Sequence, residues 1–92
     1  MNDSVNIEPK NLSKLKVGET GRILKIDVPS QNGEVLTRLL ELGFIEGQTV
    51  TVFQKAMLGD PIAVDLHQTR IGLRKSEAEN IQVVPIDRTY DE

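Results

Sequence analysis

The chain contains no cysteine and no tryptophan, and it has a single histidine in 92 residues. Without cysteine it forms no disulfide and offers no thiolate for catalysis or for a zinc site. Its only aromatic residues are Phe44, Phe53 and Tyr90, fewer than a stacking platform for single-stranded nucleic acid needs. The net charge of −3 provides no global positive field for nucleic acid or anionic lipid. These absences argue against thiol chemistry and nucleic-acid binding.

Long apolar segments are also missing from the sequence. No run approaches the roughly 20 apolar residues that a membrane-spanning helix needs, and residues 1–10 have no apolar core of signal-peptide length. We therefore expect a cytoplasmic protein without direct membrane insertion. Its length indicates one domain with one modest core. We expect that domain to span residues 12–86, between a flexible leader at 1–11 and a polar tail at 87–92.

Alternating apolar and polar residues predict about five short strands separated by turns. We place these strands at residues 20–28, 47–56, 62–67, 70–74 and 81–83. So many short strands in so short a chain favour a small barrel or sandwich, which removes its edges by closure. One unpaired edge would leave room for a homo-oligomer.

One short α-helix is predicted between about residues 34 and 42. Leu36, Leu39 and Leu40 recur there at helical spacing and share one face. Asn32 stands just before this segment and is a candidate N-cap. We expect the helix to close one end of the barrel or to lie beside it.

Glycine and proline mark two turns. Gly43 follows the predicted helix at the position where a left-handed residue is expected, and Phe44 would then contact Leu39 in a Schellman ending. Gly59 and Pro61 belong to the turn between the second and third predicted strands. We interpret these three turn residues, Gly43 included, as structural.

A second helix of a single turn is predicted near residues 76–79. Ser76 and Glu79 have the spacing of a capping box, with Ser76 at the N-cap and Glu79 at the third helical position. This short helix would separate the fourth predicted strand from the fifth.

The sequence offers no constellation typical of an enzyme. Its serines all fall in leader, turn or cap contexts, so a Ser-His-acid arrangement would have to use one of them. The glycines are scattered and form no phosphate-binding loop. A basic cluster at residues 70–75 is more typical of a solvated strand face than of an RNA contact. We therefore predict neither catalysis nor nucleic-acid binding.

Asp65 and His67 are the candidate metal ligands. They are two residues apart on the third predicted strand, so both side chains would leave the same face, with Asp60 at the preceding turn. A carboxylate and an imidazole suit Fe(II) or Mn(II). Two ligands do not complete a site, and a solvated strand face often carries such pairs. The pattern therefore indicates weak Fe(II) binding at most and no required cofactor.

Met57 and Leu58 stand immediately before the turn Gly59-Asp60-Pro61. Apolar side chains exposed at a loop tip would favour contact with another protein. The alternative is that Leu58 folds back beneath its own hairpin and belongs to the core.

Five blocks of the sequence carry a family resemblance in their order and spacing. They are Leu12-Ser13-Lys14-Leu15-Lys16-Val17-Gly18-Glu19, Arg38-Leu39-Leu40-Glu41-Leu42-Gly43-Phe44 with a following Gly47, Leu58-Gly59-Asp60-Pro61-Ile62, Leu73-Arg74-Lys75-Ser76-Glu77-Ala78 and Asn80-Ile81-Gln82-Val83. Together they closely resemble the FeoA family of ferrous iron transport accessory proteins over about residues 12–84. Met57 departs from the pattern, because many members have proline there, and this leaves the rigidity of the turn open.

The resemblance implies a mostly β, small SH3-like barrel and a cytosolic helper of FeoB, the membrane ferrous iron transporter with a GTP-binding domain. It carries no catalytic residues. The surface that we predict for FeoB comprises Arg38, Met57, Leu58 and Asp60, and it would modulate transporter assembly or GTP hydrolysis. The resemblance also implies kinship with the SH3-like domain of diphtheria-toxin-repressor-type regulators, so an iron-responsive metal-binding regulatory module is the alternative.

Overall fold

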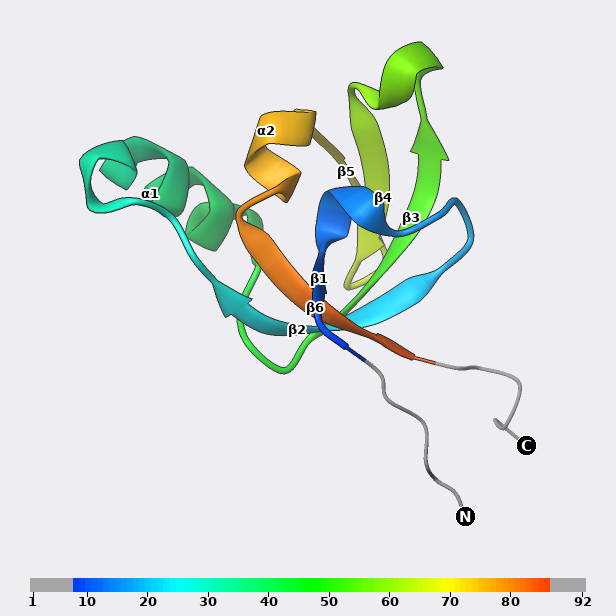
Figure 1. The fold of residues 1–92 in the computed structure, drawn as a ribbon, viewed down its shortest axis with the longest axis horizontal. Coiled ribbons are helices and arrows are strands. Elements are labelled where there is room, and N and C mark those ends of the chain that lie inside the picture. The colour runs from blue at the N-terminus through cyan, green and yellow to red at the C-terminus, as the bar shows by residue number, and fades with distance from the viewer. Residues whose placement is uncertain (1–7, 87–92) are drawn as a thin grey trace.

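Six antiparallel strands form one curved sheet in the computed structural model, which describes residues 8–86 (Figure 1). The strands are β1 (Lys10–Asn11), β2 (Thr20–Ile26), β3 (Thr49–Lys55), β4 (Ile62–Leu66), β5 (Thr69–Leu73) and β6 (Ile81–Ile86). They lie in the order β1-β6-β2-β3-β4-β5. The register shifts within β2, between Ile23 and Lys25, and within β3, between Val52 and Gln54. Such bulges increase the local bend of a strand and help a small sheet to curl around its core.

The sequence predicted about five strands, and the sixth is β1. Lys10 pairs with Val83 and Asn11 pairs with Gln82, although both residues of β1 fall in the segment expected to be a leader. A two-residue strand has no period that a sequence could reveal, so only its partner β6 identifies it. The remaining predictions for residues 1–7 and for the tail at 87–92 lie outside the described residues.

The main helix is α1 (Gly33–Leu42), preceded by the 3-10 turn η2 (Ser30–Asn32). Its predicted ending is confirmed. Gly43 has φ 103°, the Gly43 N–H donates to the carbonyl of Leu40 at 3.0 Å, and the Phe44 N–H donates to that of Leu39 at 3.1 Å. These two bonds define a Schellman motif. At the other end Asn32 occupies the N-cap position, but its side chain makes no capping bond.

The short helix α2 (Lys75–Ala78) begins one residue earlier than predicted, and the Ser76–Glu79 capping box is wrong. Arg74 is the N-cap, and its N–H donates to Glu77 Oε1 at 2.9 Å. Because arginine has no acceptor, only the glutamate half of a capping box exists here. The Lys75 N–H is satisfied instead by Asp60, fifteen residues away, which no local pattern could indicate.

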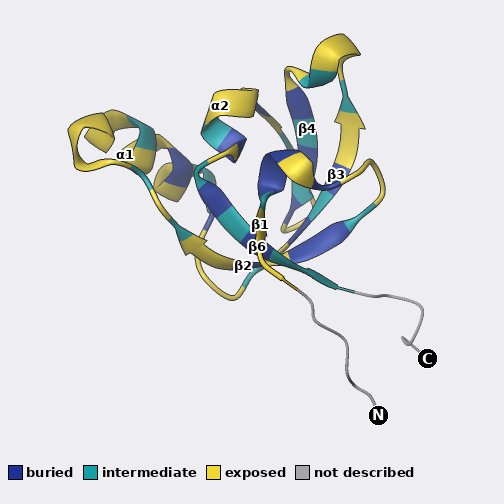
Figure 2. Ribbon diagram, viewed as in Figure 1, coloured by how far each residue is buried: buried dark blue, intermediate teal, exposed yellow. Residues whose placement is uncertain are grey.

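The core lies between the concave side of the sheet, α1, α2 and the 3-10 turn η1 (Leu12–Lys14), as Figure 2 shows. Phe44 is its largest fully buried side chain. The other buried apolar residues are Leu12, Leu15, Ile23, Leu39, Val50, Val52, Ile62, Val64, Leu66, Leu73, Ala78, Ile81 and Val83. No helix in the described part of the chain is long and apolar enough to cross a membrane.

Candidate partner-binding site

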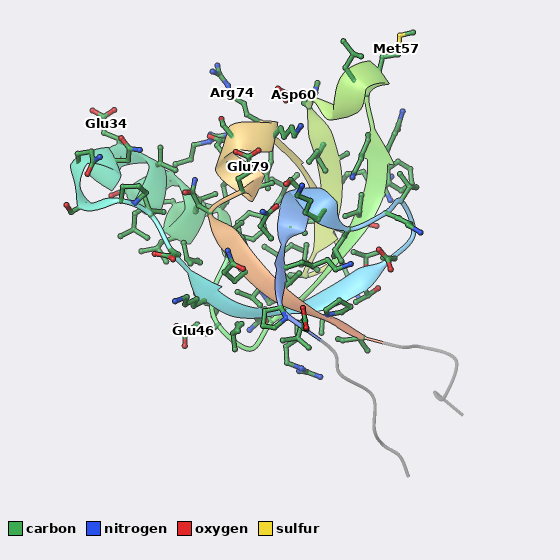
Figure 3. All side chains as sticks on the ribbon, in the orientation of Figure 1. Glu34, Glu46, Met57, Asp60, Arg74 and Glu79 are labelled. Carbon is green, nitrogen blue, oxygen red and sulfur yellow. The ribbon has the colours of Figure 1, made fainter. Side chains whose placement is uncertain are left out.

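The 3-10 turn η3 (Met57–Gly59) joins β3 to β4 at one extreme of the molecule (Figure 1). Met57 is 87% exposed and Leu58 is 97% exposed, and Figure 3 shows Met57 pointing away from the body of the fold. The structure therefore has the exposed arrangement, and Leu58 does not fold beneath its hairpin. We call Met57 and Leu58 the apolar tip.

The backbone of the apolar tip is held in an unusual conformation. Leu58 has φ 67° and Gly59 has φ 79°, both in the left-handed region. For a residue with a Cβ this region costs about 1–2 kcal/mol. The loop is closed at its base by the Gly59 N–H, which donates to the Ala56 carbonyl at 2.8 Å, and by the Ala56 N–H, which donates to the Pro61 carbonyl at 3.0 Å. This loop therefore combines a strained backbone with two apolar side chains exposed to water. Backbone strain of this kind is common at functional sites.

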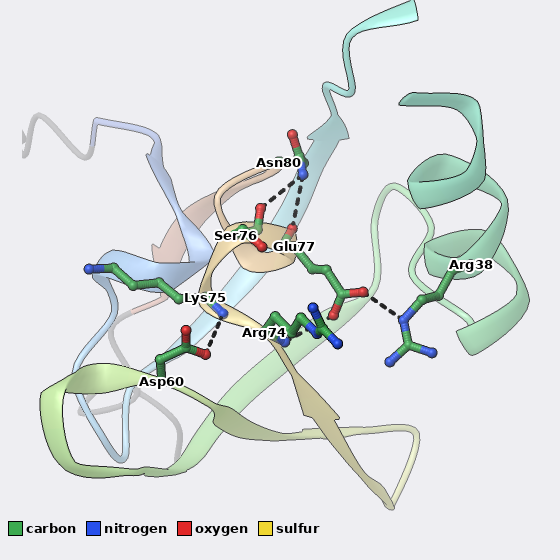
Figure 4. A network of polar contacts seen from close by, with 7 residues as sticks. All are labelled: Arg38, Asp60, Arg74, Lys75, Ser76, Glu77 and Asn80. Atoms are coloured by element: carbon green, nitrogen blue, oxygen red, sulfur yellow. Dashed lines mark hydrogen bonds and ion pairs between the residues drawn. The ribbon is translucent and has the colours of Figure 1, made fainter. Parts of the chain in front are cut away.

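Asp60 anchors the apolar tip to α2. Its Oδ1 accepts the backbone N–H of Lys75 at 2.9 Å, as Figure 4 shows. Carboxylates are favourable partners for the unsatisfied N–H groups at the beginning of a helix. Asp60 therefore attaches the loop of the apolar tip to α2, the helix that follows β5.

Arg38 lies on the opposite side of α2 from Asp60 (Figure 4). Its Nε donates to Glu77 Oε2 at 2.7 Å, while Glu77 Oε1 accepts the Arg74 N–H. The Glu77 carboxylate thus joins α1 to the first turn of α2, and Asp60 joins α2 to the apolar tip. The structure brings Met57, Leu58 and Asp60 together and connects Arg38 to them only through α2.

We expect Asp60→Ala to loosen the apolar tip without unfolding the domain. The Lys75 N–H would lose its acceptor, which costs about 1 kcal/mol at an exposed site. Amide hydrogen exchange at Met57, Leu58 and Gly59 should accelerate, whereas exchange in β2 should not change. Unchanged exchange in η3 would show that its own backbone bonds hold it.

An apolar groove that the sequence did not predict lies between α1 and the end of β2. Its volume is about 380 Å³, and it is lined by Ile26, Leu36, Leu40, Ile45 and Glu46. The sequence placed Leu36, Leu39 and Leu40 on one face, but only Leu39 is buried and Leu40 is 48% exposed. The sequence did contain a signal for the groove, because the apolar face of this helix is broader than a single contact with the core requires. Figure 3 shows Glu46 far from Met57.

Asp65 and His67 are not neighbours on one strand as predicted, because β4 ends at Leu66. His67 has φ 55° and Gln68 has φ 65°, so they form the two-residue type I′ turn between β4 and β5. The periodicity failed because the tight hairpin starts one residue earlier than the alternation suggested. Asp65 and His67 do line one polar hollow of about 370 Å³, together with Thr49, Thr51, Gln68 and Arg70.

The carboxylate of Asp65 is engaged by Arg70. Its oxygens accept Arg70 Nε at 2.8 Å and Nη2 at 3.3 Å, and the guanidinium also lies 3.4 Å from the centre of the Phe53 ring. Within residues 8–86 no group of three or more histidine and acidic side chains is placed to hold a metal ion. Weak Fe(II) binding by Asp65 and His67 stays a prediction, and a metal would have to compete with Arg70.

The hydrogen bond from Arg70 lowers the pKa of the Asp65 carboxyl below its ordinary value of 3.8, and the charge of Arg70 acts in the same direction. A lowered folded-state pKa contributes stability above the unfolded pKa that is lost as the pH falls through the folded value. We expect Arg70→Gln to return the pKa of Asp65 toward 3.8. An NMR titration of the side-chain carboxyl carbon measures it, and an unchanged pKa would contradict the pairing.

Comparison with known proteins identifies the family of the chain. The chain matches the FeoA domain over residues 10–85. A protein of Porphyromonas gingivalis, the Fe(2+) transport protein A/Fe(2+) transporter FeoB fusion protein, is 35% identical over 72 residues, which are 78% of this chain and 8% of that protein. The chain therefore spans less than a tenth of the length of this relative.

Two solved structures are also similar. Iron(II) transport protein A from Clostridium thermocellum is 37% identical with a TM-score of 0.76, over 83% of this chain and 45% of that one. FeoA of Stenotrophomonas maltophilia, complexed with zinc and described as a procaryotic SH3 domain protein, is 30% identical with a TM-score of 0.74, over 86% of this chain and 98% of that one.

The prediction of a mostly β, SH3-like barrel is confirmed by the antiparallel sheet and by these relatives. The family match runs from Lys10 in β1 to Pro85 in β6 and includes the apolar tip, α1 and α2. The chain belongs to the FeoA domain family, which is linked to ferrous iron transport.

Proposed function

We propose that this chain is a cytosolic accessory module of ferrous iron uptake that binds an FeoB-type transporter through its apolar tip. The observation that carries the proposal is the pair Met57 and Leu58, which is almost fully exposed on a loop fixed by hydrogen bonds. Burying one such side chain against a partner contributes about 1.5–3 kcal/mol. A loop that is already ordered in the free protein loses little entropy on binding.

A relative in which FeoA and FeoB form one polypeptide supports this choice of partner. Fusion holds the two parts at a high effective concentration, which benefits modules that act on each other. Asp60 positions the tip, and the Arg38–Glu77 ion pair holds α2, on which Asp60 is anchored. Bound in this way, the module would modulate assembly of the transporter or its GTP hydrolysis.

The test is a pull-down of the purified chain against the FeoB transporter of the same cell, with and without Fe(II) and guanine nucleotide. We expect binding that does not require Fe(II), because the apolar tip has no carboxylate or imidazole, the side chains that suit Fe(II). Binding only with Fe(II) would favour the alternative, a metal-responsive regulatory module in which Asp65 and His67 contribute. Absence of binding in every state would contradict the proposed partner.

GTP hydrolysis by the transporter provides the second measurement. Titrating the chain into the transporter should change the hydrolysis rate up to a plateau, with a midpoint at the affinity found in the pull-down. If the hydrolysis rate does not change even when the transporter is saturated with the chain, modulation of the GTPase is excluded. Assembly of the transporter then remains as the proposed function.

A further inference from the structure

The strand β5 forms one edge of the sheet, because β4 is its only partner in the part of the chain that the structure describes. The pairing runs without a bulge, with Leu66 opposite Thr69, Asp65 opposite Arg70 and so on to Ile62 opposite Leu73. In a two-residue hairpin the pair next to the turn is hydrogen-bonded, and the following pairs alternate.

This alternation decides which backbone groups face outward. Arg70 and Gly72 occupy the positions that are not hydrogen-bonded to β4, so their N–H and C=O groups point to the open edge. Both residues are exposed, and no turn or loop of the described chain bonds their backbone groups. The edge therefore offers the N–H and C=O groups of both Arg70 and Gly72 to an added strand, which needs such outward backbone groups to pair.

Beside this edge lies an apolar hollow of about 170 Å³. It is lined by Gln54, Ala56, Pro61, Ile62, Ala63 and Gly72. Gly72 is required there neither by a positive φ nor by crowding, since a Cβ added to it would meet no atom within 4 Å. Its small size instead leaves the hollow open to a side chain that arrives opposite it.

The charges along β5 restrict what can pair with it. Arg70 and Gly72 share one face of β5. Arg74, whose backbone is still extended, and Lys75 follow directly after the strand. Asp65 pairs with Arg70, but within residues 8–86 no carboxylate forms an ion pair with Arg74 or Lys75. Two copies of β5 paired antiparallel around Gly72 would place Arg70 of one opposite Arg74 of the other. Like charges directly opposite are unfavourable, so the edge disfavours a second copy.

We propose that the open edge of β5 binds an extended acidic segment of a partner protein as an added strand. The segment has an apolar residue opposite Gly72, which enters the hollow over Ala63, and an acidic residue two positions away, opposite Arg74. This inference goes beyond the transporter contact through the apolar tip, because it concerns another surface and does not depend on which protein supplies the segment.

A capped peptide of sequence Thr-Glu-Thr-Leu-Thr-Glu-Thr tests the proposal, since its symmetry allows parallel and antiparallel pairing. In an NMR titration of the full chain, amide signals of Arg70 and Gly72 should shift, and their hydrogen exchange should slow. The same peptide with lysine in place of glutamate should not bind. Signals that move instead at the apolar tip or at Leu36 and Leu40, or no binding of the acidic peptide, would overturn the proposal.

Gly72→Pro removes the outward N–H and leaves the bonds to β4 intact, which edge strands tolerate. We expect it to weaken binding of the peptide by roughly tenfold relative to the matched variant Gly72→Ala, which keeps the donor but also places a Cβ in the hollow. If Gly72→Pro fails to fold, the pair Arg74→Glu and Lys75→Glu serves, because it should abolish binding of the acidic peptide and admit the lysine peptide. Unaltered binding by a folded Gly72→Pro, or a concentration-dependent dimer with slowed exchange at β5, would overturn the proposal.

Discussion

Replacement of both Met57 and Leu58 by aspartate is expected to abolish binding to the transporter. Residues that anchor an interface contribute about 2 kcal/mol or more each, so losing two should weaken binding by about 1,000-fold. The stability of the domain should not fall, because these side chains are 87% and 97% exposed and contribute little to the core. Binding would be measured by pull-down and by titration of GTP hydrolysis, and stability by thermal unfolding.

The matched control is Val17→Asp. Val17 is also an exposed apolar residue, 58% exposed, but it lies in the turn before β2 and not in η3. It should leave both binding and unfolding unchanged. Equal loss of binding in Val17→Asp and in the tip variant would mean that general charge, not the tip, decides the contact. Retained binding in the tip variant would remove the apolar tip from the proposed function.

The local turns could be predicted from sequence because their geometry depends on a few neighbouring residues. The end of α1 shows this. Gly43 and Phe44 alone specify the Schellman motif, and both backbone bonds are present. The exposed tip was one of two predicted alternatives, since Leu58 could equally have folded back under its own hairpin. Deciding between them required the positive φ of Leu58, which sequence does not report.

Other features depend on contacts between distant segments and could not be predicted. The strand β1 exists only because β6 pairs with it, and α2 begins at Lys75 because Asp60 accepts its N–H. The two-residue turn at His67 and Gln68 ended β4 before the alternation did. The groove between α1 and β2 was missed because a helical face that looks uniformly apolar in sequence is divided in three dimensions. Leu39 packs inward, and Leu40 remains at the surface.

Phe44→Ala should destabilise the fold more than any variant discussed above. Phe44 is fully buried, and its backbone N–H closes the end of α1. Removing a buried phenylalanine side chain costs about 3–5 kcal/mol, against a total of about 5–15 kcal/mol for a small domain. The melting temperature should fall by about 15 °C or more, and the urea midpoint should fall in proportion. Circular dichroism measures both.

Phe53→Ala is the matched control, because it removes the same side chain from the surface of β3. Phe53 is 43% exposed and contacts the guanidinium of Arg70. Its loss should lower the melting temperature only slightly, so the difference between the two variants isolates the effect of burial. A small effect of Phe44→Ala, comparable to that of Phe53→Ala, would contradict the placement of Phe44 in the core.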